Sequence, residues 1–398
     1  MLWQLTRRFL REPDKRLLCR FAFSFGWRGM RSVRAFQRRQ ARGIYFPAFM
    51  FISITSLCNL RCQGCWVSVS PANGRQLDLE TLDRLIVECK KQGSFFFGLL
   101  GGEPLLHPGL FELIGRHRDC YFQLFSNGTT LTESVARTLR SLGNVTPLIS
   151  IEGIPQVSDE RRGGRDVYRR AMAGLEQCRK QRLITGVATS VCQSNFNDLV
   201  SDRFVDDLIQ RGVLYLWYYI YRPVGPNPSP ELCLNEDQIL RLRQYMVDLR
   251  TRAPIVVVDA YWDQEGRALC PAAVGISHHI NPAGDVEPCP VVQFARENVK
   301  DGQGLVDLVV QSEFLGRFRD FAARTTRGCV LLDRPDLLRQ FLKEQKARDT
   351  SGRETAFAEL EAMVSRPGHH LPGREIPEKH WVYRFAKKHW FFGFGAYG

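Results

Sequence analysis

From Phe49 onward, the hydrophobic positions alternate between a strand-like and a helix-like pattern. Six short runs are rich in β-branched and aromatic residues, and helical spacing fills most of the segments between them. The six runs are Phe49–Ile54, Phe95–Leu100, Tyr121–Phe125, Pro147–Ile151, Ile184–Val191 and Leu214–Tyr221. The clearest helical segment begins after Asp78, a candidate N-cap, and another runs from Asp166 to Arg182.

This alternation predicts parallel βα units. A strand, a helix and a second parallel strand connect by a right-handed crossover, so six such units curl into a partial (β/α)6 barrel or a doubly wound sheet. In either architecture the functional loops follow the carboxyl ends of the strands. We therefore assign residues 47–255 to an α/β domain and look for chemistry at its strand ends.

The pattern changes after the sixth run. The segment "YRPVGPNPSPELC" contains four prolines and predicts a loop, followed by a helix from Asn235 to about Arg250. Residues 256–335 form a smaller region of a different kind, in which Val256–Val258 is a candidate strand. Residues 336–398 contain a charged helical segment and an aromatic tail.

The first 46 residues form a basic amphipathic arm. Residues 1–43 hold twelve Arg or Lys against Glu12 and Asp14, so they carry +10 of the net charge of +13. Large apolar residues lie between these cations, and Pro13 predicts a break between two short helices. Such helices suit an anionic membrane surface. Docking on the protein's own body is the alternative, and nucleic-acid contact is the least favoured of the three.

Cysteine usage and the lack of export signals indicate a reducing compartment. No apolar run is long enough to span a membrane, and the N-terminus does not resemble a secretory signal. We therefore expect a cytoplasmic protein, with the arm as the feature that would place it on the inner face of a membrane. In such a compartment, clustered cysteines among the twelve present are expected to bind metal or do chemistry.

Three thiols lie within eight residues of the loop after the first run: Cys58, Cys62 and Cys65. Three is an odd number for disulfides and one short of a closed tetrahedral zinc site. Three thiolates can hold three irons of a 4Fe–4S cluster and leave the fourth iron free for a small molecule. A zinc site and a set of packing cysteines are the alternatives.

The motif "CNLRCQGC" resembles the signature of the radical S-adenosylmethionine (radical SAM) enzymes. Further motifs of that family follow in order at the predicted strand ends: "GGEP" after the second strand, "FSNGT" after the third, "SIEG" after the fourth and "YRPVGP" after the sixth. The resemblance covers about Phe49 to Gly225. One departure is Gly64, where many members have an aromatic residue that packs over the adenine.

The resemblance implies roles for the "GGEP" residues. SAM would bind to the free iron through its amino and carboxylate groups. Gly101 and Gly102 would let the backbone approach the methionine part of SAM, which a Cβ would obstruct. Glu103 would orient the ammonium group of SAM.

The later motifs would hold the rest of the cofactor. Ser126 and Asn127 would bond the ribose, and Ser150 and Arg162 would hold the SAM carboxylate, for which a bidentate guanidinium is suited. An electron from the cluster would then cleave SAM to a 5′-deoxyadenosyl radical, which abstracts hydrogen from an unactivated C–H bond. The family motifs assign no further catalytic residue.

A second set of cysteines is spaced more widely: Cys270, Cys289 and Cys329. A "PAGD" turn before "VEPC" predicts a hairpin that presents Cys289, and Gly284 completes a G-x4-C pattern. This region resembles the auxiliary-cluster (SPASM or Twitch) regions that follow many radical SAM domains, which implies a second 4Fe–4S cluster. Its fourth iron would be open or closed by His278 or His279. Buried cysteines and zinc are the alternatives.

These features together predict a radical SAM enzyme that receives electrons from a reductant such as ferredoxin or flavodoxin. The basic arm and the aromatic tail favour a lipid or membrane-associated substrate. A peptide substrate, as for SPASM-type maturases, is the alternative, and a non-enzymatic iron–sulfur or zinc protein is the alternative of another class.

Overall fold

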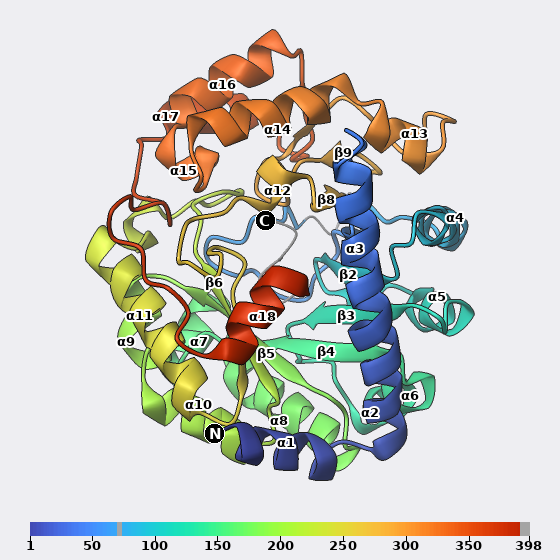
Figure 1. Ribbon diagram of the computed structural model, residues 1–398, viewed down its shortest axis with the longest axis vertical. Helices are drawn as coiled ribbons and strands as arrows, with labels where there is room; N and C mark the ends of the chain where they lie inside the picture. The colour runs from blue at the N-terminus through green and yellow to red at the C-terminus, as the bar shows by residue number, and fades with distance from the viewer. Residues whose placement is uncertain (70–73, 391–398) are drawn as a thin grey trace.

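The computed structural model describes residues 1–69 and 74–390, and its centre is one parallel sheet (Figure 1). The six predicted strands pair in chain order, each parallel to the next. They are β1 Phe49–Thr55, β2 Phe96–Gly101, β3 Tyr121–Ser126, β4 Val145–Ser150, β5 Gly186–Val191 and β6 Tyr215–Ile220. This order confirms the partial (β/α)6 barrel.

Both edges of the barrel are extended by strands from beyond residue 255. The short strand β7 (Val256–Val258) pairs parallel with β6, and β8 (Ser277–Ile280) pairs parallel with β1. β9 (Val286–Glu287) turns back antiparallel on β8. The later region therefore grows directly out of the sheet and lies against the first strand, which carries the cysteine loop at its end.

Helices cover the outer face of the sheet (Figure 1). They are α4 Leu79–Lys91, α5 Leu110–Arg116, α6 Glu133–Leu142, α7 Pro155–Arg161, α8 Val167–Lys180, α9 Phe196–Leu199, α10 Asp202–Gln210 and α11 Glu236–Arg252. Asp78 caps α4 as predicted, since its Oδ1 accepts a bond of 2.7 Å from the Thr81 amide.

Residues that alternate along the strands point to opposite faces of the sheet and so belong to two separate hydrophobic cores. Met50 and Ile52 pack toward the helices, whereas Phe49 and Phe51 belong to the core inside the barrel.

The arm lies against the body, as the docking alternative predicted. Pro13 separates α1 (Leu2–Arg11) from α2 (Lys15–Phe21). A π-helical segment, η1 (Ala22–Trp27), and a third helix, α3 (Arg28–Gln40), then follow, and the apolar pattern did not predict them. The inward side of the arm adds Phe25, Val33 and Phe36 to the core inside the barrel.

Inward arginines of the arm bond backbone carbonyls at or just beyond the ends of the barrel helices. Arg20 donates to the Leu142 carbonyl over 2.6 Å, and Arg39 donates to the Gln92 carbonyl over 2.5 Å. Arg8 reaches the Pro254 carbonyl over 2.7 Å. Helix C-termini leave carbonyls unpaired and carry a partial negative charge, so cations stabilise them. Part of the arm's charge is thus used within the molecule, and the membrane interpretation of its outward side stays a prediction.

The C-terminal part adds short helices and ends on α18 (Trp381–His389). The others are α12 Pro271–Val274, α13 Leu305–Val310, α14 Glu313–Thr325, α15 Val330–Asp333, α16 Pro335–Glu344 and α17 Ala356–Ala362. The strands β10 (Phe294–Ala295) and β11 (Arg348–Asp349) form a separate small ladder. The end of the aromatic tail, from residue 391, lies outside the described residues.

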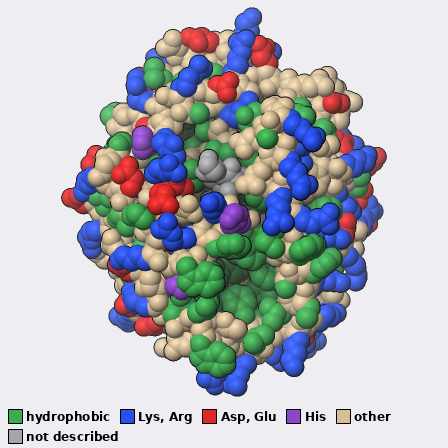
Figure 2. All heavy atoms as spheres, in the orientation of Figure 1, with side chains coloured by type: hydrophobic (Ala, Val, Ile, Leu, Met, Phe, Trp, Pro, Cys, Tyr) green, Lys and Arg blue, Asp and Glu red, His purple; other side chains and the backbone are tan. Residues whose placement is uncertain are grey.

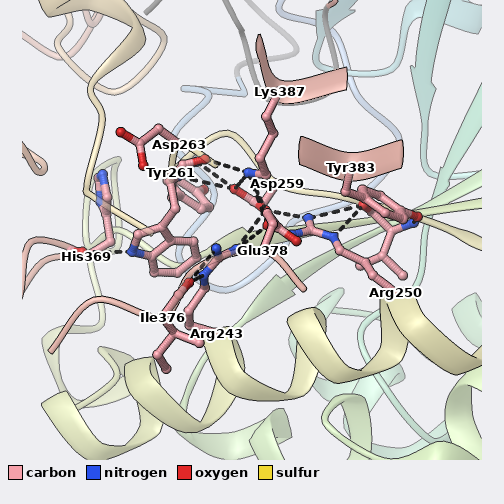
Figure 3. Close-up of polar contacts among 12 residues, drawn as sticks. Arg243, Arg250, Asp259, Tyr261, Asp263, His369, Ile376, Glu378, Tyr383 and Lys387 are labelled. Atoms are coloured by element: carbon pink, nitrogen blue, oxygen red, sulfur yellow. Dashed lines mark hydrogen bonds and ion pairs between the residues drawn. The ribbon is translucent and has the colours of Figure 1, made fainter. Parts of the chain in front are cut away.

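A buried ionic network anchors α18 (Figure 3). Lys387 lies 3.2 Å from Asp259, and Arg250 bonds both Asp259 and Glu378. Arg243 joins Glu378 at 2.7 Å, and all five side chains are at most 2% exposed. The network ties the C-terminal segment to α11 and to the loop after β7.

Across the described ranges, no helix is both long enough and apolar enough to cross a bilayer.

Candidate functional site: two thiol sets in one cavity

A cavity of about 430 Å³ lies at the carboxyl ends of the strands. Twelve of the thirteen predicted site residues line it: Cys58, Cys62, Cys65, Gly101, Gly102, Ser126, Asn127, Ser150, Arg162, Cys270, Cys289 and Cys329. They come from segments more than 250 residues apart in the sequence. The fold thus gathers both thiol sets and the strand-end motifs around one space.

The first thiol set lies on the loop after β1. Burial raises the pKa of the Cys65 thiol to about 12, and the neighbouring Cys62 adds to the rise. Arg162 Nη1 lies 3.4 Å from Cys62 Sγ, and Asn127 Nδ2 lies 3.9 Å from Cys58 Sγ. A cation and an amide donor therefore stand beside sulfurs of the half-buried cysteines. These are groups that stabilise thiolates, the form that binds iron.

Arg162 offers more donors than the protein uses. Its Nε and Nη2 atoms are buried without a hydrogen-bond partner among the described residues, although the side chain lines the cavity. Burial alone would lower the pKa of Arg162, but Cys62 and Glu152 together raise it, so it stays charged. A buried guanidinium with free N–H groups fits the carboxylate of a ligand such as SAM.

Glu103 is the predicted residue that does not line the cavity. Its carboxylate accepts bonds from Ser126 Oγ over 2.9 Å and from the Asn127 amide over 2.7 Å. Burial raises the pKa of Glu103, while these bonds oppose the rise. In this structure Glu103 ties the end of β3 to the end of β2 and so positions the two ribose-side residues.

Gly102 allows the cysteine loop to pack against the end of β2. A Cβ at this position would lie 2.0 Å from the Leu57 carbonyl oxygen, and the Gly102 amide donates to the Thr55 carbonyl over 2.7 Å. Close backbone contact was predicted here, but the partner is the loop that carries the thiols. The glycine therefore positions the first thiol set.

We expect Gly102→Ala to displace this loop. Because backbone cannot yield as a flexible side chain does, the substitution should cost about 1–3 kcal/mol of unfolding free energy and reduce bound iron. The measurements are a denaturant midpoint and an iron assay on anaerobically prepared protein. Gly115→Ala is the control, since its nearest neighbour is Leu142 at 3.5 Å and alanine favours the helix. Equal iron in both variants would contradict this role.

Tyr221 explains the departure at Gly64. A Cβ on Gly64 would lie 2.2 Å from the Tyr221 hydroxyl oxygen, and Gly64 has a φ of +64°. Tyr221, at the end of β6, lines the cavity together with Trp217 and Tyr219. An aromatic ring from another strand thus occupies the space that a side chain at position 64 would take. The sequence signal was the alternation of aromatic residues along β6.

The second thiol set lines the same cavity as the first. Cys289 follows the antiparallel β8–β9 hairpin, as the "PAGD" turn predicted, and Gly284 has a φ of +98° in that turn. Burial raises the pKa of Cys270 to about 11. Arg222 Nε lies 3.3 Å from Cys329 Sγ, so each thiol set has one buried arginine against it. Sequence reasoning missed Arg222, although it lies in the "YRPVGP" motif.

The two histidines differ in their availability. His279 uses both ring nitrogens, at 2.7 Å from Ser53 Oγ and 2.6 Å from Glu287 Oε2. His278 lines the cavity, and its Nδ1 atom is buried without a partner in the part of the chain that the structure describes. Of the two residues considered for a fourth ligand, His278 is the one with a free nitrogen.

A single zinc ion needs its ligands gathered around one point. Within residues 1–69 and 74–390, no three His, Cys, Asp or Glu side chains are close enough together for one metal ion. All twelve cysteines are free thiols. The donor sets, each made of three thiols beside a cation, fit the iron–sulfur chemistry predicted from the sequence.

Comparisons with known proteins agree with this geometry. Residues 52–200 match the model of the Radical SAM superfamily. Fe-coproporphyrin III synthase of Methanosarcina barkeri is 26% identical over 53% of this chain and 55% of that protein. This chain thus spans about half the length of that relative.

Two further relatives extend beyond the matched domain. Mycofactocin maturase MftC of Mycobacterium tuberculosis is 25% identical, covering 70% of this chain and 74% of the maturase. The crystal structure of Streptococcus suis SuiB bound to precursor peptide SuiA shares the fold with a TM-score of 0.61, at 16% identity over 75% of this chain and 72% of SuiB. Residues 52–200 therefore belong to the Radical SAM superfamily, and the likeness to MftC and to the fold of SuiB continues beyond that domain.

Proposed function

We propose that this protein is a radical SAM enzyme that removes a hydrogen atom from an unactivated C–H bond of its substrate. The observation that carries the proposal is the convergence of the Cys58, Cys62 and Cys65 loop with the strand-end motifs on one cavity. When bound, a 4Fe–4S cluster and SAM supply the electron and the hydrogen-abstracting radical.

In this proposal the protein's own residues bind the cluster and SAM and orient them. The three thiols of the β1 loop would hold the cluster, with Arg162 beside Cys62. The free N–H groups of Arg162, together with Ser150, would hold the carboxylate of SAM. Ser126 and Asn127, held by Glu103, would bond the ribose.

The second thiol set would hold an auxiliary 4Fe–4S cluster in the same cavity. Cys270, Cys289 and Cys329 would be its ligands, and His278 would be the residue able to close the fourth position. Arg222 would stabilise the thiolate of Cys329, as Arg162 does for Cys62. A substrate between the two sets would meet both groups.

Arg162 provides a test of the SAM site. We expect Arg162→Lys to raise the Kd for SAM about tenfold to a hundredfold, because lysine cannot reproduce the forked donor pair and a charge-assisted bond is worth about 1.5–3 kcal/mol. Equilibrium dialysis under anaerobic conditions measures this change. Arg165→Lys, at an exposed position, should leave the Kd unchanged. An unchanged Kd in Arg162→Lys would remove Arg162 from the carboxylate site.

The lining of the cavity favours a substrate with a large apolar part. Phe51, Phe125 and Trp217 line it and belong to the core inside the barrel. Burying apolar surface drives such binding. A lipid or other membrane-associated molecule fits this lining and the exposed side of the arm.

A peptide is the second candidate substrate. It is favoured by the relatives, since MftC is named as a maturase and SuiB was solved with a precursor peptide. A peptide-modifying maturase would use the same two thiol sets. Comparison of lipids, metabolites and peptides from cells with and without the protein separates the two substrate classes.

The reaction would also need an electron donor such as ferredoxin or flavodoxin. Twelve free cysteines suit a reducing compartment such as the cytoplasm. The deciding experiment is anaerobic reconstitution followed by assay for 5′-deoxyadenosine in the presence of a reductant. Stable iron with no 5′-deoxyadenosine would favour a non-enzymatic iron–sulfur protein, and bound zinc would favour a structural metal site.

A further inference from the structure

Large hydrophobic side chains are exposed on the two ends of the chain. They are Trp3 (75% exposed), Leu10 (58%), Phe23 (54%), Trp27 (52%), Trp381 (66%) and Phe385 (51%). Figure 2 shows hydrophobic side chains gathered around a hollow on the face where α1, α3 and α18 lie, with Lys and Arg around them. An exposed apolar area of this kind marks an interaction site.

Each of the three helices presents aromatic and basic residues on one outward stripe. In α1 the stripe is Trp3, Arg7 and Leu10, and in α18 it is Trp381, Phe385 and Lys388, both with the spacing i, i+4, i+7. The stripe of α3 starts just before the helix and continues the same spacing: Trp27, Arg31, Arg34 and Arg38. We call the residues of these three stripes the basic aromatic face.

The inward sides of the same helices are fixed to the barrel. Arg8 and Arg39 bond backbone carbonyls of the body, and α3 buries Val33 and Phe36. In α18, Lys387 enters the buried ionic network (Figure 3). The outward aromatic residues are therefore held in place by packed helices.

The core inside the barrel connects this face with the cavity. Phe51 and Phe125 line the cavity, and the core that contains them also includes Phe9 and Phe21 of the arm. This packed apolar core therefore lies between the arm and the cavity.

We propose that the basic aromatic face binds the surface of an anionic lipid bilayer. Tryptophan at the headgroup level and arginine against anionic lipids are the groups that such surfaces select. A second copy of the chain fits less well, since two such faces would bring like charges together. The inference deepens the lipid-substrate form of the proposed function, because docking would place the hollow against the acyl chains, but binding can be tested without any substrate.

The test is flotation of the full-length holoenzyme with vesicles. Vesicles of phosphatidylglycerol mixed with phosphatidylcholine should bind the protein, and vesicles of phosphatidylcholine alone should bind it far less. Trp3→Ser combined with Trp381→Ser and Phe385→Ser should weaken binding at least about tenfold. Val364→Ser, an exposed position (68%) outside the three helices, should leave it unchanged.

Charge removal gives a second, independent variant. Arg31→Gln with Arg34→Gln and Arg38→Gln should weaken binding to the anionic vesicles about a hundredfold, because each cation near such a surface contributes about fivefold. Added salt should also weaken the binding of the unaltered protein to anionic vesicles, because it screens the charges. Circular dichroism of each variant checks that the fold is kept.

Several outcomes would overturn the inference. They are absence of binding to anionic vesicles, equal binding by all variants, self-association through this face in sedimentation experiments, and tighter binding to a short RNA or DNA duplex than to vesicles. Assay of 5′-deoxyadenosine on the same preparations separates the two proposals. Normal SAM cleavage without vesicle binding would contradict only the membrane inference. Vesicle binding without SAM cleavage would contradict only the proposed enzymatic function.

Discussion

Replacing Cys58, Cys62 and Cys65 together by alanine is expected to abolish SAM cleavage. These thiols are the only cysteines on the loop after β1, and they line the cavity beside Arg162 and the strand-end motifs. Without them the cofactor would have no iron to bind and no source of an electron. The measurement is 5′-deoxyadenosine formed under a strong reductant, with iron and sulfide content determined on the same sample.

The second thiol set supplies the matched control. Alanine at Cys270, Cys289 and Cys329 should also remove iron, but it should leave SAM cleavage without substrate largely intact, because these thiols lie outside the loop after β1 and outside the strand-end motifs. Modification of the true substrate should fail in this variant. Retention of full iron in either triple variant, or loss of SAM cleavage in the second alone, would contradict the assignment of the two sets.

Arg250→Met is expected to destabilise the protein by about 3–5 kcal/mol, although it lies outside the cavity lining. The Arg250 side chain is fully buried and bonds Asp259, Glu378 and the Val257 carbonyl. Methionine fills much of the same volume but leaves buried carboxylates with fewer cations. A shift of the urea midpoint measures the loss.

Arg252→Met is the control for this change. It lies two residues away on the same helix and pairs with Asp202, but the two side chains are 47% and 56% exposed. An exposed pair is worth about 1 kcal/mol at most. Similar urea midpoints for the two variants would show that the buried network contributes no more to the free energy of unfolding than an exposed ion pair does.

Acid should weaken the same network. Burial raises the pKa of Asp259, but Lys387 and Arg250 outweigh it and hold that pKa well below the ordinary value of 3.8. The folded state therefore binds this proton less readily than the unfolded state. The resulting stability is present above the ordinary pKa and is lost as the pH falls below it. The difference between the urea midpoints of the unaltered protein and Arg250→Met should therefore be smaller at acidic pH than at neutral pH.

Much of the barrel followed from local pattern. The six hydrophobic runs became β1 to β6 because each is short, apolar and bounded by turn residues, and parallel pairing in chain order is the simplest outcome of right-handed crossovers. The hairpin before Cys289 followed in the same way from its turn residues. The short strands β7 and β8 complete the sheet only because β6 and β1 offer unpaired edges, so tertiary pairing decides them.

In the candidate site too, some features were predicted from the local sequence, whereas others depend on contacts between distant segments. Spacing identified the thiols, and the resemblance to the radical SAM motifs identified Ser126, Asn127, Ser150 and Arg162, since each lies within or beside a local motif. The partner of Glu103, the Tyr221 ring over Gly64 and the contact of Arg222 with Cys329 join segments far apart in the chain. Periodicity along one strand contains no information about such contacts.

By itself the sequence determined the order of the strands, the grouping of six cysteines into two sets of three and the basic character of the arm. These properties depend on residue type and on spacing within short segments. Tertiary structure alone decided that the two thiol sets share one cavity, that five of the arm's twelve cations bond backbone carbonyls of the body, and that α18 stands beside the arm with Trp381 and Phe385 outward. Those outcomes depend on which distant surfaces become buried together, because burial sets which polar groups must find a partner and which apolar ones stay exposed.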